Sequence, residues 1–181
     1  MPRLDPLPPE PQDPVTAEVF ETFAREGRAP ILLYRLLAHN PPLLRSYATL
    51  ARGLRYGART PRPLRELVIL RIAQLTGSDY EWSHHRKMAE AAGVPEEQVR
   101  ALADWRAAGC FDATERAALR CAEEIHAIEL SDDAFAELRA QLPDDEALEI
   151  AVLAAFYEMV ARIIQATGVE VEPEYAPYLK P

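Results

Sequence analysis

The segment 64–93, which reads LRELVILRIAQLTGSDYEWSHHRKMAEAAG, constrains the fold more than any other part of the chain. Its first half is apolar around nearly the whole circumference of a helix, although it carries Glu66 among apolar neighbours. Gly77 then breaks the helical pattern, and Ser78 is a typical residue to open the next helix. A helix that is apolar on all sides needs neighbours on all sides, so this segment predicts a packed helical protein.

The second half of the segment predicts a helix over 79–92 with polar groups on its apolar face. At about 100° per residue, one arc of this helix holds Glu81, Trp82, His85, Met88, Ala89 and Ala92. The opposite face, which we expect to be solvated, holds Asp79, Ser83, Arg86, Lys87 and Glu90, with His84 at the edge of the arc. A buried charge is costly unless it is paired or neutralised, so Glu66, Glu81 and His85 are candidate catalytic groups.

A structural interpretation competes with the catalytic one at each of these positions. Ser78 and Glu81 fit the S-x-x-E capping box, in which the two side chains bind reciprocal backbone donors at a helix start. His85 follows Glu81 by one turn, close enough for a hydrogen bond, and a core histidine with such a partner is common. Tyr80 and Trp82 are either packing groups or the aromatic wall of a small-ligand site.

The rest of the chain is helical in pattern, and no strand is predicted. The expected helices cover residues 15–26, 30–38, 41–56, 63–76, 79–92, 95–108, 112–128, 131–141 and 144–166. Asp112 to Glu115 resembles a capping box, and prolines or glycines stand near most boundaries. The fold class is therefore all-α, with a Pro-rich arm at 1–14, a single helical domain at 15–168 and a tail at 169–181.

Composition limits the partners that we expect. The formal charge of −9 and the lack of basic blocks argue against binding to nucleic acid or to an anionic membrane. No apolar run approaches the roughly 20 residues of a membrane span, and no secretory leader is recognisable, so we expect a cytoplasmic protein. Cys110 and Cys121 fall in different local settings and predict reduced packing residues rather than a disulfide.

The helix expected at 144–166 is apolar over much of its surface. Together with the helix at 63–76, it offers more apolar surface than one small bundle would hide. A helix of this kind is central or lies at a subunit interface. We therefore expect a homo-oligomer.

Two Glu-x-x-His units, Glu81 to His84 and Glu123 to His126, allow a metal-dependent alternative. Two-metal helical bundles use such units together with further carboxylates, which Glu66 and Glu149 or Glu158 could supply. The short expected helices fit that plan poorly, and the pattern arises easily by chance in a glutamate-rich chain. We therefore expect no metal and no other cofactor.

The residues LRELVILRIAQLTGSDYEWSHH, followed by GVPEEQVRAL and FDATERAALRCAEEI, resemble the carboxymuconolactone decarboxylase family, which shares its fold with alkyl hydroperoxidase D-like proteins. The resemblance covers about residues 40–168 and implies an alkyl hydroperoxidase D-like helical bundle. In the peroxidase branch a glutamate is followed by CxxC and then by a histidine. The matching positions here are Glu66, Ser78, Glu81 and His85, so both cysteines are replaced.

The loss of both cysteines implies a change of chemistry, because peroxide reduction needs a thiolate and a resolving thiol. The decarboxylase branch, which acts on a small lactone acid without a cofactor, is the nearer model. We expect a lyase-like enzyme for a small organic acid or lactone, with His85 as acid/base and Glu66 and Glu81 orienting it. Ser78, Tyr80, Trp82 and His84 would bind the substrate. The alternatives are a peroxidase-like antioxidant, a metal-dependent oxidoreductase and a non-catalytic small-ligand binder.

Overall fold

The computed structural model describes residues 2–179, and within this range the regular structure is entirely helical. The helices are α1 (Pro14–Arg25), α2 (Leu32–Leu37), α3 (Pro41–Arg52), the π-helical turn η1 (Gly53–Gly57), α4 (Arg62–Thr76), α5 (Asp79–Ala92), α6 (Glu96–Ala101), the short η2 (Leu102–Asp104), α7 (Ala113–His126), α8 (Asp132–Gln141), α9 (Asp144–Thr167) and the 3₁₀ segment η3 (Pro173–Tyr178). The expected all-α class is confirmed. Residues 1 and 180–181 of the expected arm and tail lie outside the described range.

Local sequence signals set several helix ends. Gly77 adopts a φ of 66°, which lets the chain reverse after α4, and the Ser78 side chain then accepts a hydrogen bond at the start of α5. At α7, Asp112 and Glu115 form the expected capping box, with each side chain accepting from the other's backbone N–H. The turn at Gly77 and the cap at Ser78 place α4 and α5 side by side.

Two expected helices end earlier than their sequence pattern indicates. The helix expected at 95–108 ends at Ala101 and is followed by η2. The reason is that the Arg116 side chain donates hydrogen bonds to the backbone carbonyls of Trp105, Arg106 and Ala108. The helix expected at 41–56 changes into η1 after Arg52, where Arg65 donates to the carbonyl of Arg55 at 3.0 Å. π-helical turns of this kind are frequent at functional sites.

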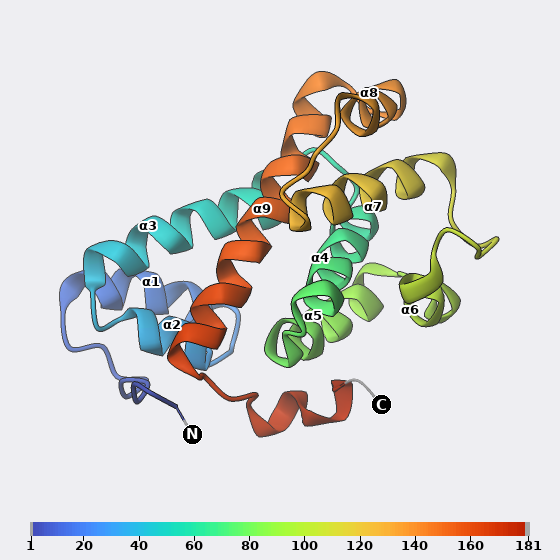
Figure 1. The fold of residues 1–181 in the computed structure, drawn as a ribbon. Coiled ribbons are helices and arrows are strands. Elements are labelled where there is room, and N and C mark those ends of the chain that lie inside the picture. Colours follow the sequence, from blue (N-terminus) through green and yellow to red (C-terminus); the bar gives the residue numbers. More distant parts are fainter. Residues whose placement is uncertain (1, 180–181) are drawn as a thin grey trace.

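Helix α4 occupies the centre of the molecule and packs against α5, α7 and α9 (Figure 1). One side of α4 contributes Val68 and Ile72 to the larger core, and another side contributes Leu67 and Leu70 to a second core. Burial on several sides explains why its sequence is apolar all round.

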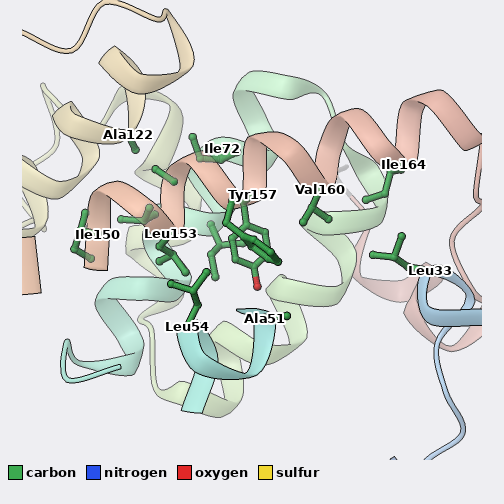
Figure 2. Packing of buried hydrophobic residues seen from close by; sticks show 14 of the residues in the cluster. Leu33, Ala51, Leu54, Ile72, Ala122, Ile150, Leu153, Tyr157, Val160 and Ile164 are labelled. Carbon is green, nitrogen blue, oxygen red and sulfur yellow. The ribbon is translucent and has the colours of Figure 1, made fainter. Parts of the chain in front are cut away.

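Helix α9 lines the larger core along its inner face. Figure 2 shows Leu153, Tyr157 and Val160 of this helix among buried side chains from other elements, including Leu54 of η1. Its outer face exposes Leu148, Val152 and Met159. The homo-oligomer remains a prediction, and this apolar outer face is where we would expect its contact.

Both ends of the chain are bound to the helices. The backbone N–H of Arg3 donates to the Thr167 carbonyl at 2.8 Å, and that of Leu7 donates to Arg35 at 3.2 Å. At the other end η3 packs along α5 (Figure 1). Among the described residues, none of the helices has both the length and the apolar character that crossing a membrane requires.

Candidate functional site

The central pair of the site joins α4 to α5. His85 Nδ1 lies 2.8 Å from Oε2 of Glu66, and both side chains are buried. Arg62 Nε lies 3.6 Å from the other Glu66 oxygen, and the ring of Tyr157 meets the His85 ring edge-on with the centroids 4.8 Å apart. Within the described chain, Nε2 of His85 forms no hydrogen bond. The structure therefore brings two of the three expected catalytic residues together and leaves one imidazole nitrogen available.

Glu81, the third expected catalytic residue, is buried in a different state. Its side chain is 2% exposed, and neither carboxylate oxygen has a hydrogen-bond partner. Burial raises the pKa of Glu81 to about 8, with a smaller contribution from the charge of Glu158, while nearby Ser78 opposes the shift. Glu81 is thus mainly a neutral carboxylic acid at pH 7.

Two expectations about Glu81 are corrected. Its carboxylate does not bond to His85, which pairs with Glu66 instead. The capping box is half formed. The Ser78 hydroxyl accepts a hydrogen bond from the Glu81 backbone N–H at 3.4 Å, but the Glu81 carboxyl accepts none from the Ser78 backbone. The carboxyl group stays unpaired in the interior.

His84 and Ser83 are more deeply buried than the helical projection indicated. His84 is 3% exposed, and Ser83, expected on the solvated face, is fully buried. The reason is η3, which covers a side of α5 that the projection left open. The ring of Tyr175 in η3 stacks on His84 with a centroid separation of 3.6 Å, and Tyr80 stacks on the opposite face at 4.4 Å.

Glu172 connects this tail to the site. Its Oε2 lies 2.8 Å from Nε2 of His84, and its Oε1 accepts from the Tyr80 hydroxyl at 2.9 Å and from the Leu32 backbone at 2.7 Å. Burial lowers the pKa of His84 despite the opposing effect of Glu172, so the ring is neutral and donates through Nε2. Its Nδ1 is buried without a partner.

Several of these groups line a small cavity whose lining residues are mostly buried. Its volume is about 40 Å³, and its polar lining consists of Tyr34, Tyr47, Arg55, Tyr80, Glu81, His84, His85 and Tyr157. The space exceeds that of a single water but is far smaller than a typical ligand pocket of roughly 300 Å³ or more. The cavity must widen before an organic substrate can reach His85.

Two residues expected to bind substrate lie elsewhere. Trp82 packs into the second core with Leu67 and Leu70, so it supports α5 from the side away from the cavity. Ser78 caps α5 and lines a separate surface pocket near the C-terminal end of α9. Tyr80 and His84 do line the cavity.

Sequence reasoning missed Glu172, Tyr175, Tyr34 and Arg55. The alternation of Val169-Glu-Val-Glu172 was a weak indication that this tail packs on the helices. Both valines contact the larger core, and in an extended chain the alternate residues point to the opposite side. Arg55 lies in η1, whose π-helical geometry has no signature in the sequence that we could identify.

The structure separates the two Glu-x-x-His units. Glu123 accepts hydrogen bonds from Arg71, Arg106 and the Trp105 indole, while His126 pairs with Glu158 at 2.6 Å. Among residues 2–179, no group of three or more His, Cys, Asp or Glu side chains is arranged to hold a metal ion. Of the carboxylates in the metal-dependent alternative, Glu66, Glu123 and Glu158 are therefore engaged with other partners, whereas Glu81 is unpaired.

Neither cysteine reaches the cavity. Cys121 is fully buried in the larger core, and burial together with the charge of Glu124 raises its pKa to about 11. Cys110 is partly buried beside the second core. The expectation of two unpaired cysteines agrees with this arrangement.

The helical fold that holds the buried Glu–His pair is the one found in alkyl hydroperoxidase D-like structures. The debrominase Bmp8 has the same fold, with a TM-score of 0.82 and 22% identity over 97% of this chain and 95% of that chain. A cysteine-to-alanine variant of Bmp8 in complex with 2,3,4-tribromopyrrole gives a TM-score of 0.83, with the same identity and the same shares of both chains. An uncharacterized peroxidase-related protein from Silicibacter sp. TM1040 gives 0.79 and 21% identity, covering 96% of this chain and 94% of that chain.

The family resemblance is also confirmed. Residues 41–124 match the model of the carboxymuconolactone decarboxylase family. Over that segment the chain is similar to this family, and its fold is that of the alkyl hydroperoxidase D-like structures. No curated protein sequence matches it.

Proposed function

We propose that this protein is an acid/base enzyme that decarboxylates or isomerises a small organic acid or lactone without a cofactor. The observation that carries the proposal is the buried 2.8 Å contact between His85 Nδ1 and Glu66, beside a cavity that also holds the neutral carboxyl group of Glu81. Pairs of titratable groups held in different protonation states are typical of acid/base sites.

The two carboxyl groups serve different steps. Glu66 accepts a hydrogen bond from Nδ1–H of His85, so that Nε2 is the basic nitrogen and the imidazolium is stabilised once it forms. In an isomerisation, Nε2 removes a proton from a carbon next to the substrate carbonyl and returns it to a second carbon. Glu81 donates a hydrogen bond to the enolate oxygen on which the charge develops.

Decarboxylation uses the same groups with one net proton consumed. The electron pair of the breaking carbon–carbon bond moves into the substrate carbonyl as carbon dioxide leaves, and Glu81 stabilises the resulting enolate. His85, protonated at the start, then delivers its proton to the carbon, and solvent restores that proton for the next turnover. Neither reaction requires an external oxidant or reductant.

A screen of β-keto acids and of lactone carboxylates whose carboxyl-bearing carbon is next to the carbonyl, or conjugated with it through a double bond, tests the proposal, with carbon dioxide release and substrate loss as readouts. His85→Ala should reduce turnover of an active compound by about 10²-fold or more. The matched control is His126→Ala, because that histidine also pairs with a glutamate but lies outside the cavity. Full turnover by His85→Ala would overturn the assignment.

Peroxidase-like activity is the second candidate, because similar structures carry peroxidase-related names. It would have to use Cys110 or Cys121, and the raised pKa of Cys121 disfavours its thiolate. Thiol-dependent consumption of an organic hydroperoxide, lost in a variant with both cysteines changed to serine, would favour this candidate over acid/base chemistry. Resistance of both thiols to labelling in the native protein would count against it.

A further inference from the structure

A surface cleft of about 580 Å³ lies next to the small cavity. It is lined by residues of α1, the chain that follows α1, α2, α3 and η1, and Figure 1 shows α1 and α3 side by side. Tyr34 and Arg55 line both the cleft and the cavity. These two side chains therefore stand at the boundary between the outer space and the site.

Most arginines of this cleft already have a carboxylate partner. Arg45 pairs with Glu18 at 2.7 Å, Arg25 pairs with Glu21 at 3.0 Å, and Arg28 pairs with Glu26. Arg52 and Arg55 have no ion pair with a described carboxylate, and of these two only Arg55 also lines the cavity. The Arg55 guanidinium donates to the Tyr34 hydroxyl at 2.9 Å and to the Ala51 carbonyl at 3.3 Å.

A guanidinium with unused donors, facing the same cavity as Glu81 and His85, suits an anionic ligand. An arginine side chain has five N–H donors in a planar fork that matches a carboxylate, and the described neighbours of Arg55 leave some of them free. Glu66 and Glu81 alone would disfavour a negatively charged substrate, particularly above pH 8 when Glu81 ionises. A cation facing the same cavity offsets that effect.

We propose that the substrate enters through this cleft and that Arg55 binds its carboxylate, with the Tyr34–Arg55 contact separating to admit it. The inference rests on the proposed function and narrows its substrates to compounds with a free carboxylate close to the reacting carbon. Separation of the two side chains merges the 580 Å³ cleft with the 40 Å³ cavity, which gives the substrate the space that the cavity alone lacks.

Binding of γ-butyrolactone-γ-carboxylate and of its neutral carboxamide, measured by calorimetry and saturation-transfer NMR, tests the inference. His85→Ala protein is used, so that no turnover disturbs the measurement. We expect the acid to bind at least about tenfold more tightly than the amide, and Arg55→Gln to remove this preference while leaving amide binding within twofold. Arg45→Gln, in the same cleft but paired with Glu18, should keep the preference.

Equal or absent binding of the acid and the amide to the parent protein would overturn the inference, as would an acid preference that survives Arg55→Gln. If Arg55→Gln does not fold, Arg55→Lys, which keeps the charge but not the fork, should retain the preference in weakened form; an unchanged preference contradicts the guanidinium's role. The binding and turnover measurements distinguish failure of this inference from failure of the proposed function. Acid binding through Arg55 without turnover of any acid would refute the proposed function alone, and normal turnover by Arg55→Gln would refute this inference alone.

Discussion

His85 and Glu66 meet at 2.8 Å although 19 residues separate them in sequence. The turn at Gly77 folds α5 back along α4, so the two side chains face each other inside the protein. A carboxylate at this position fixes both the orientation and the tautomer of the imidazole. The pair is the part of the site on which the proposed chemistry depends most.

Replacing Glu66 with glutamine should impair catalysis without loss of the fold. The amide keeps the shape of the side chain but no longer stabilises an imidazolium, so we expect kcat to fall by about 10²-fold or more with a smaller change in KM. Steady-state kinetics on an active lactone acid would measure the effect. Glu90→Gln, on the exposed side of α5, is the control and should leave kcat unchanged.

Glu81 should give the enzyme an alkaline limit. Its raised pKa of about 8 means that the neutral acid needed to donate a hydrogen bond disappears as the pH rises through 8. We expect kcat/KM to fall above that pH in the parent protein. Glu81→Gln should lose this alkaline limb, because the amide donates at every pH; an unchanged limb in the variant would assign it to another group.

The same carboxyl group should make stability depend on pH. The folded-state pKa of about 8 lies above the ordinary value of 4.5, so the unfolded chain releases the proton first as the pH rises. Stability is therefore lost progressively between about pH 4.5 and pH 8. Glu81→Gln should remove this loss, gaining up to a few kcal/mol over the parent at pH 8, as measured by urea unfolding at several pH values.

Glu172 should hold the C-terminal segment on α5. Its carboxylate accepts from the Leu32 backbone, from Tyr80 and from His84, so Glu172→Ala leaves three buried donors unpaired. We expect a destabilisation of about 3 kcal/mol or more and faster hydrogen exchange in η3 and α5. Glu174→Ala is the control, because that side chain is exposed. Equal effects of the two variants would contradict this role.

The outer face of α9 provides a test of the predicted homo-oligomer. Leu148 and Val152 are 58% and 38% exposed on adjacent turns, so changing both to glutamate should disrupt a contact between copies. Light scattering coupled to gel filtration should then show a lower mass than for the parent protein. Ile128→Glu is a suitable control, because Ile128 is 86% exposed and lies beyond the end of α7. A monomeric parent protein would refute the prediction.

Features set by neighbouring residues could be predicted from the sequence, whereas contacts between distant residues could not. Helix α5 has the bounds expected from Ser78 and Gly93, because capping residues act on their immediate neighbours. The pairing of His84 with Glu172 joins positions 88 residues apart, and no periodicity within α5 indicates it. The depth of burial of His84 was missed for the same reason, since Tyr175 of η3 stacks on a ring that an isolated helix would expose to water.

Arg55 illustrates a different limit. Its position depends on the change from α3 to the π-helical turn η1, which shifts the register of the side chains that follow. A regular helix over 41–56, as the sequence pattern indicates, would place Arg55 differently with respect to the cavity. Glu66, Glu81 and His85 were predictable because buried ionisable groups at helical spacing stand out in an apolar pattern.

The most direct test of the acid/base account is incorporation of solvent deuterium into a bound organic acid. We would incubate the parent protein, His85→Ala and His126→Ala with the panel of lactone and keto acids in deuterated water and follow the loss of carbon-bound proton signals by NMR. The account predicts catalysed exchange at a carbon next to a carbonyl in the parent and in His126→Ala, and exchange at the uncatalysed rate in His85→Ala. Equal exchange in the parent protein and in His85→Ala would contradict it.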